Sequence, residues 1–233
     1  MKLYENLAEF YDLLYDYRDY DSESGFLVES FGGLEIPRLL DIGCGTGSHL
    51  AALRRILSSA RLVGIDLSED MLNVARRKNL RARLERADMR DFNLGEEFDL
   101  AYCFSSSLQY NLFSDDLERT FDAIRKHIPS GLFVFDLAYC QERWMEGYTN
   151  ITTGSNEDVQ VAELFTSHSK GGFASLNSLY LVKNNKTGKL DMQVDSHTIR
   201  LWSLTEIEDF LKRKGFDYEL NQESVPRFTV SID

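Results

Sequence analysis

The sequence predicts an α/β fold in which helices cover a mostly parallel, seven-stranded sheet, and an antiparallel β meander is inserted late in the chain. Short apolar runs alternate with helical patterns as far as Asp136, which is typical of repeated β-α-β units. Three glycines at alternate positions follow the first apolar run. Between residues 157 and 202 the pattern changes to strict alternation, interrupted by Gly-Gly and Asn-Asn turns, which predicts antiparallel strands.

Composition excludes several classes of protein. At 233 residues and 43% hydrophobic content, the chain has the size of one domain with a real core. No apolar run approaches the roughly 18 residues of a membrane span, and residues 1–5 do not resemble a signal peptide. The net charge of −12 disfavours a nucleic-acid partner, because phosphates require clustered cations. We therefore expect no membrane and no nucleic acid among its partners.

Cysteine and histidine spacing give two further expectations. The three cysteines form no C-x-x-C pair and lie in or beside expected buried strands, which indicates reduced thiols in a cytoplasmic protein. The four histidines do not cluster with acids at ligand spacing, so no metal site is expected. The residues concerned are Cys44, Cys103, Cys140, His49, His127, His168 and His197.

The glycine turn is the first element that indicates a ligand. Residues 36–42 form an expected buried strand, Gly43, Gly45 and Gly47 follow it, and a helical pattern begins directly after them. Glycine lets the backbone turn tightly and lets a ligand approach without meeting a Cβ. Ser48 stands at the position where a dinucleotide fingerprint, G-x-G-x-x-G, would need its third glycine. Asp41 would repel a diphosphate and attract a cation, so an NAD-dependent oxidoreductase is the disfavoured alternative.

Acids end the strands that follow. The expected strand 61–66 ends at Asp66, 19 residues after Gly47, the separation expected of a carboxylate that accepts hydrogen bonds from ribose hydroxyls. A helix capped by Ser68 follows it. The strands expected at 81–88, 98–104 and 132–136 bring Asp88, Cys103 and Asp136 to the same edge of a parallel sheet. Ligands bind beyond that edge in such sheets.

The remaining elements complete the chain in order. Residues 4–20 are rich in tyrosine and show helical spacing, and a second helix is expected from Gly25 to Leu34. A helix begins at Ser114 and ends before Pro129. The meander of roughly three strands places His197 on the polar parity with Gln193 and Asp195, as a solvent-facing histidine would be. A capping box then opens a helix at residue 203, and strands are expected at 216–220 and 227–232.

The chain resembles the class I methyltransferases that depend on S-adenosylmethionine (SAM), whose first motif has the form D-x-G-x-G-x-G. The segments S-E-D-M-L, D-M-R-D-F, F-S-S-S-L-Q-Y and D-S-H-T-I-R-L-W-S are most similar to small-molecule members, in particular aminosugar N-methyltransferases. The resemblance covers essentially the whole chain and implies a Rossmann-like class I methyltransferase fold in a single domain 1–233. Its parts are an N-terminal helical lid (1–35), a SAM-binding core (36–140), a substrate-side insertion (141–202) and a closing helix with the last two strands (203–233).

The resemblance also implies site residues. Asp88 would accept from the adenine amine, with Met89 as its apolar neighbour. An amine nucleophile must be neutral, and an acidic or phenolic partner can hold it and pass on its proton. The candidates for this role are Tyr11, Tyr15, Tyr110 and His197. The residues expected to bind SAM are Tyr11, Tyr20, Asp41, Gly43, Cys44, Gly45, Gly47, Asp66, Leu67, Met71, Asp88, Met89, Cys103 and Phe104.

The expected activity is methyl transfer from SAM to a small-molecule acceptor, most simply an amine. Two alternatives stay open from sequence: a small-molecule O-methyltransferase, and a SAM-binding protein without turnover. The expected partners are the small substrate and, as one option, a second copy of the chain in a homodimer.

Overall fold

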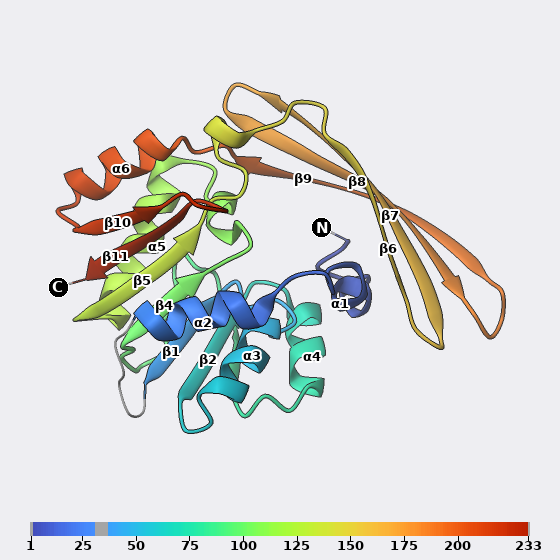
Figure 1. The fold of residues 1–233 in the computed structure, drawn as a ribbon, viewed down its shortest axis with the longest axis horizontal. Helices are drawn as coiled ribbons and strands as arrows, with labels where there is room; N and C mark the ends of the chain where they lie inside the picture. Colours follow the sequence, from blue (N-terminus) through green and yellow to red (C-terminus); the bar gives the residue numbers. More distant parts are fainter. Residues whose placement is uncertain (1, 31–36, 233) are drawn as a thin grey trace.

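A computed structural model describes residues 2–30 and 37–232 (Figure 1). A seven-stranded sheet has the order β10-β11-β5-β4-β1-β2-β3. Its pairs are parallel except those of β11 with β10 and with β5, which are antiparallel. This confirms the predicted mostly parallel sheet. The strands are β1 (Arg38–Ile42), β2 (Arg61–Asp66), β3 (Arg83–Arg86), β4 (Leu100–Cys103), β5 (Gly131–Asp136), β10 (Tyr218–Asn221) and β11 (Arg227–Ile232).

Helices cover both faces of this sheet. On one face α2 (Tyr20–Ser30), α3 (Ser48–Ile56) and α4 (Glu69–Arg77) contribute to a core cluster with Leu39. On the other face α5 (Ser114–His127) and α6 (Leu204–Arg213) pack in a second cluster with Leu40. Neighbouring residues of β1 thus point to opposite faces, and both are fully buried. That is why the strand reads as a continuous apolar run.

Two predicted helix starts have the expected caps. The Ser68 hydroxyl accepts a hydrogen bond from the Met71 amide at 3.2 Å, and Ser203 forms a reciprocal capping box with Glu206. Within the described residues no helix has the length and apolar character needed to cross a membrane.

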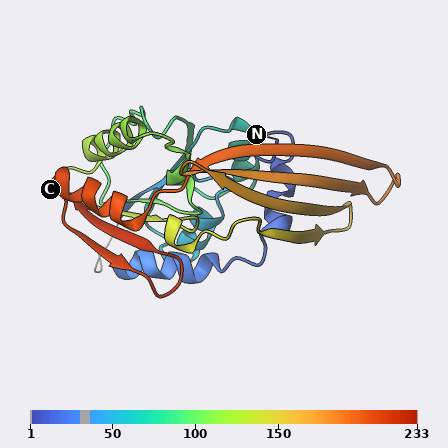
Figure 2. The ribbon, with the colours of Figure 1, turned by 90° about the horizontal axis from the view of Figure 1, so that it is seen from above.

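The insertion forms a separate antiparallel sheet in the order β6-β7-β8-β9. Its strands are β6 (Thr149–Ser155), β7 (Val159–Lys170), β8 (Phe173–Asn184) and β9 (Leu190–Arg200). Figure 2 shows this sheet reaching away from the helix-covered core. The prediction of roughly three strands missed β6, because its sequence T-N-I-T-T-G-S carries one aliphatic side chain and no apolar alternation.

The sequence predicts that the polar side chains of β9, including His197, face solvent. In the structure His197 faces inward, and the apolar side chains of Met192 and Val194 face outward. Met192 and Val194 are 63% and 62% exposed, whereas Asp195 is only 8% exposed. His197 shares the inner face with Asp195 and lies against Tyr4 and Tyr110. The prediction of a solvent-facing His197 is wrong because the inner face of the sheet lines a polar cavity. A polar side chain in this strand therefore need not be exposed to solvent.

The N-terminal segment lies against the inner face of the second sheet (Figure 1). It is not one helix over residues 4–20 but a short 3-10 turn, η1 (Ala8–Phe10), followed by a single helical turn, α1 (Tyr11–Leu14). Leu7 and Leu14 are buried with Val161 and Tyr180 of the sheet. The next helix begins at Tyr20 rather than Gly25, and its expected end near residue 34 lies outside the described residues.

Candidate active site

A first cavity of about 280 Å³ lies at the carboxyl ends of the parallel strands. The loops after β1, β2, β3 and β4 form its floor and walls, and three tyrosines of the N-terminal segment close it from above. Those tyrosines are Tyr4, Tyr11 and Tyr20.

The glycine turn forms the floor of this cavity. The amides of Gly43 and Cys44 both donate to the Ile65 carbonyl, at 2.8 and 2.9 Å, which fixes the turn to β2. Gly43 has a φ of +75°, and a Cβ there would lie 2.9 Å from the Ser107 side chain. Only glycine combines this backbone conformation with that close approach.

Asp66 is held by the loops on either side of it. Its Oδ1 accepts from the Ser68 amide at 2.8 Å, and its Oδ2 accepts from the Gly45 amide at 2.9 Å. Burial raises the pKa of Asp66. A carboxylate has about four acceptor positions, so each oxygen of Asp66 keeps one for a ligand hydroxyl.

Asp88 lines the same cavity just beyond the end of β3. The Arg90 side chain donates to both of its oxygens, at 2.9 and 2.6 Å, and this hydrogen bonding lowers the pKa of Asp88. The carboxylate is therefore fixed in place and ionised.

A second cavity of about 310 Å³ adjoins the first. The two cavities share the residues Tyr4, Tyr11, Ser105 and Tyr110. The inner faces of β7, β8 and β9 line the second cavity with Glu163, Phe165, Ser178, Tyr180 and His197, and Tyr15, Tyr17 and Tyr139 complete its aromatic wall.

Comparison with known proteins decides the family. Residues 39–131 match the family model described as a methyltransferase domain. The chain is 30% identical over 219 residues to the dTDP-3-amino-3,6-dideoxy-alpha-D-glucopyranose N,N-dimethyltransferase of Streptomyces fradiae, covering 91% of this chain and 84% of the relative. The chain belongs to the class I SAM-dependent methyltransferases.

Solved structures of similar proteins agree with this assignment. The methyltransferase superposes on DesVI of Streptomyces venezuelae with a TM-score of 0.85 at 26% identity, covering 96% of this chain and 97% of that one. It superposes on a sugar N-methyltransferase from Streptoalloteichus with a TM-score of 0.82 at 28% identity, covering 95% and 92% of the two chains.

The first cavity of the methyltransferase fits SAM, the methyl donor of the family. Asp41 is 2% exposed, and its Oδ2 has no hydrogen-bond partner among the described residues. Burial raises the pKa of Asp41 to about 8. A buried carboxylate oxygen without a partner is unfavourable in an apolar site. The sulfonium and ammonium groups of SAM would supply the missing opposite charge.

The pH dependence of donor binding should report on Asp41. Its carboxyl is mostly neutral below its raised pKa of about 8 and ionised above it, and only the ionised form attracts a cation. SAM affinity should therefore rise by several-fold for each pH unit between about pH 6 and 8, then level off. Calorimetric titration measures this slope, with Asp41→Asn as control. An equal slope in the variant would assign the dependence to other groups.

All but two of the residues predicted to bind SAM line the first cavity. Cys103 is fully buried in the core of the sheet. Gly47 packs the loop against other parts of the core, where a Cβ would lie 2.5 Å from Leu80. Several lining residues were not predicted from the sequence, namely Tyr4, Thr46, Ser48, His49, Arg90 and Asn111.

The four candidates for holding the nucleophile lie at or beyond the junction of the two cavities, and Tyr15 lines the second cavity alone. Tyr11 lines both cavities. The Tyr110 hydroxyl lies 3.1 Å from the Tyr4 hydroxyl and 3.5 Å from Nδ1 of His197. Burial lowers the pKa of His197, which favours the neutral imidazole, and burial raises the pKa of Tyr11 and Tyr110, which keeps both phenols protonated.

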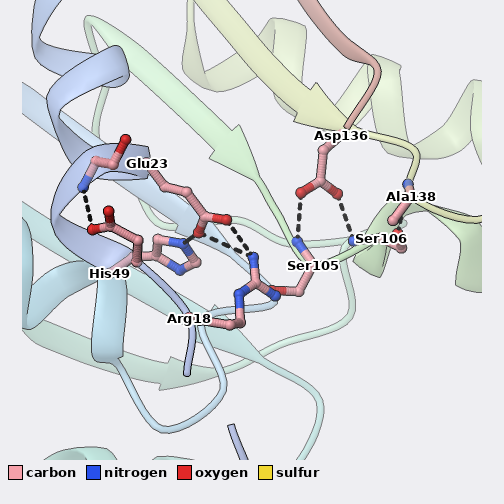
Figure 3. Close-up of polar contacts among 9 residues, drawn as sticks. Arg18, Glu23, His49, Ser105, Ser106, Asp136 and Ala138 are labelled. Atoms are coloured by element: carbon pink, nitrogen blue, oxygen red, sulfur yellow. Dashed lines mark hydrogen bonds and ion pairs between the residues drawn. The ribbon is translucent and has the colours of Figure 1, made fainter. Parts of the chain in front are cut away.

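A partly buried ionic network lies at this junction (Figure 3). Arg18 donates to both oxygens of Glu23, at 2.8 and 3.0 Å, and Glu23 also lies 2.6 Å from Nε2 of His49. A second Arg18 nitrogen donates to the Ser105 hydroxyl at 2.5 Å. The N-terminal segment is thus tied to the loop after β4, a contact that the sequence analysis did not anticipate.

Asp136 supports the same loop through two hydrogen bonds. It accepts from the backbone amides of Ser105 and Ser106, at 2.9 and 2.6 Å, as Figure 3 shows. Both serines have a φ of 60°, a conformation that non-glycine residues adopt rarely and that needs support from surrounding structure. Asp136 is the last residue of β5, as predicted, and it lines the second cavity.

Proposed function

We propose that this methyltransferase N-methylates the amino group of a nucleotide-linked aminosugar. The observation that carries the proposal is full-length similarity to enzymes of that class. Besides the Streptomyces fradiae relative, the dTDP-3-amino-3,4,6-trideoxy-alpha-D-glucopyranose N,N-dimethyltransferase of Streptomyces venezuelae is 29% identical over 218 residues, covering 91% of this chain and 90% of the relative. The second cavity, which adjoins the first at Tyr11 and Tyr110, supplies the space for such an acceptor.

The donor-binding roles follow from the first cavity. Asp66 accepts from the ribose hydroxyls with the positions that its two backbone hydrogen bonds leave free. Asp88, fixed by Arg90, accepts from the adenine amine. Asp41 faces the cationic end, and the turn from Gly43 to Gly45 lets the ligand approach the backbone.

Acceptor positioning is assigned to Tyr11, Tyr110 and His197. When bound, SAM supplies an electrophilic methyl group. An in-line displacement needs a neutral amine held in line and a site that excludes water. The neutral imidazole of His197 can accept a hydrogen bond or a proton from the amine, and Tyr110 lies between that ring and the first cavity.

Direct assay tests this function. The purified protein is incubated with SAM and dTDP-3-amino-3,6-dideoxyglucose, and in parallel with the analogue that carries a hydroxyl at the same carbon. Mass spectrometry should detect S-adenosylhomocysteine and an N-methylated product with the amine alone. Product with the hydroxyl analogue alone would establish O-methylation instead. Binding of SAM without product from a panel of amines would indicate a protein without turnover.

Tyr11→Phe tests the role of one phenol. The variant keeps the ring that packs beside Tyr15 at a centroid distance of 4.6 Å and removes only the hydroxyl. We expect kcat/KM to fall about tenfold, or about 1.4 kcal/mol, while the melting temperature stays near that of the parent. Steady-state kinetics and thermal unfolding measure the two quantities. Parental activity in this variant would assign Tyr11 to packing alone.

Homodimerisation through the outer face of the second sheet is part of the proposal. Ile151, Leu164, Leu179 and Val194 are direct cross-strand neighbours, so one apolar row crosses all four strands. Three of these side chains are 42–68% exposed. An uncharged row of this kind lets two copies of an acidic chain pack face to face, which is an isologous contact.

Sedimentation measures this assembly. The parent should sediment as a dimer, and Val194→Glu should sediment as a monomer because it places a charge in the row. Ile56→Glu introduces the same charge at an exposed apolar position at the end of α3 and should leave the dimer intact. A monomeric parent would overturn the proposal.

Location in the cytoplasm also belongs to this proposal. Cys44, Cys103 and Cys140 are all free and buried, which suits a reducing compartment.

A further inference from the structure

One buried carboxylate of the second cavity has no cationic partner among the described residues. Glu163 of β7 is 4% exposed and lines the cavity. Its Oε1 accepts from the Ser178 hydroxyl at 2.6 Å and from the Tyr180 hydroxyl at 2.8 Å. Its Oε2 takes part in no hydrogen bond or ion pair with the described part of the chain. The carboxylate is therefore oriented by one oxygen, and its other oxygen is available to a ligand.

The other charged groups around this cavity are already paired. Arg18 is bound to Glu23, and Asp136 accepts from two backbone amides. Burial favours the neutral form of His197. No cationic side chain among the described residues is thus paired with Glu163, and a buried carboxylate carries a stable charge only with a partner. A cationic ligand is the missing partner.

Aromatic rings line the rest of the cavity. Tyr11 and Tyr15 lie with their ring centroids 4.6 Å apart, and Tyr15 and Tyr17 lie 6.1 Å apart. Tyr139 and Tyr180 belong to the same wall. The faces of aromatic rings attract ammonium ions, including methylated ones. A carboxylate surrounded by tyrosines therefore combines the two features that recognise an alkylammonium group.

We propose that Glu163 and these tyrosines form an ammonium-binding subsite that selects amine acceptors over alcohols. The subsite captures the protonated amine as it enters the cavity and also holds the methylated ammonium of the product. Tyr11 connects this subsite to the donor cavity. The proposal rests on the proposed function for the identity of the acceptor, but it concerns binding and can be tested without turnover.

Choline and its uncharged carbon isostere, neohexyl alcohol, are suitable probes because they differ in charge and scarcely in shape. Their affinities are measured by saturation-transfer NMR for the parent and for Glu163→Gln without added donor. Glutamine keeps an acceptor for Ser178 and Tyr180 but removes the charge. We expect the parent to bind choline at least about tenfold more tightly than neohexyl alcohol, and the variant to lose about tenfold in choline affinity alone.

Glu157→Gln makes the same substitution at an exposed position between β6 and β7 and should leave both affinities unchanged. If Glu163→Gln damaged the cavity in general, the affinity for both probes would fall. A loss of choline affinity alone therefore identifies the carboxylate of Glu163 as the group that binds the cation. Equal affinity of the parent for the two probes would overturn the subsite even if the variant failed to fold. Selective choline binding without methylation of any aminosugar would instead support the subsite and reject the proposed acceptor.

Discussion

Gly43→Val is expected to abolish SAM binding. The Cβ of valine would lie 2.9 Å from the Cβ and Oγ of Ser107, in the wall of the donor cavity, and its branches would extend into the space left by glycine. The backbone at this position also has a φ of +75°, which a β-branched residue adopts only with strain. We expect affinity to fall by about 1,000-fold or more, equivalent to about 4 kcal/mol, as measured by calorimetric titration.

Gly95→Val is the matched control. Gly95 also has a positive φ, of +68°, but a Cβ there would meet nothing within 4 Å. The control therefore carries the backbone strain without obstructing the cavity, and it should bind SAM like the parent. Circular dichroism and thermal unfolding establish that both variants are folded. A folded Gly43→Val protein that binds SAM within tenfold of the parent would show that the turn does not approach the donor.

The donor half of the enzyme could be predicted because its signals are local. A buried strand, a glycine turn and an acid 19 residues after Gly47 are contiguous patterns, and parallel topology brings the strand ends to one edge. Ser68 and Ser203 likewise predict the starts of their helices, because each forms an N-cap with a residue in the first helical turn. Each of these features depends on residues close in the sequence, so tertiary contacts do not change the structure that the local pattern predicts.

The second cavity could not be predicted to the same extent, because the sheet that lines it has polar side chains on its inner face and apolar side chains on its outer face. Hydrophobic alternation identifies a strand but assumes that polar side chains face water. Here Glu163 and His197 face inward toward a cavity, and Met192 and Val194 face outward. The alternation of apolar and polar residues correctly predicts that β9 is a strand. It does not predict which face of that strand is exposed to solvent.

The network at the junction illustrates a second limit. Arg18, Glu23 and His49 are separated by five and 26 residues along the chain, and no spacing rule links them to Ser105. The positive φ of Ser105 and Ser106 also could not be predicted from the sequence, because serine has no preference for positive φ values. Such contacts depend on how the N-terminal segment packs against the core, which is a tertiary feature.

Docking of that segment leads to the second large effect, expected for Gly154→Ala. Gly154 of β6 faces the backbone of Leu13, and an added Cβ would collide with the Leu13 carbonyl oxygen and carbon. Backbone atoms cannot rotate out of the way as a side chain can, so α1 must move off the sheet. Tyr11 and Tyr15 would move with it, which opens the junction of the two cavities to water.

Because Tyr11 and Tyr15 line the proposed acceptor cavity while Asp41 and Asp66 stay in the core, turnover should fall further than donor affinity. We expect kcat/KM for the aminosugar to drop about 100-fold, close to 3 kcal/mol, and SAM affinity to drop about tenfold or less. Gly25→Ala is the control, since a Cβ in this part of α2 meets nothing within 4 Å. Kinetics, calorimetry and limited proteolysis of the N-terminal segment measure the three consequences. Full turnover with an unchanged proteolysis pattern would show that close contact between β6 and α1 is not required for catalysis.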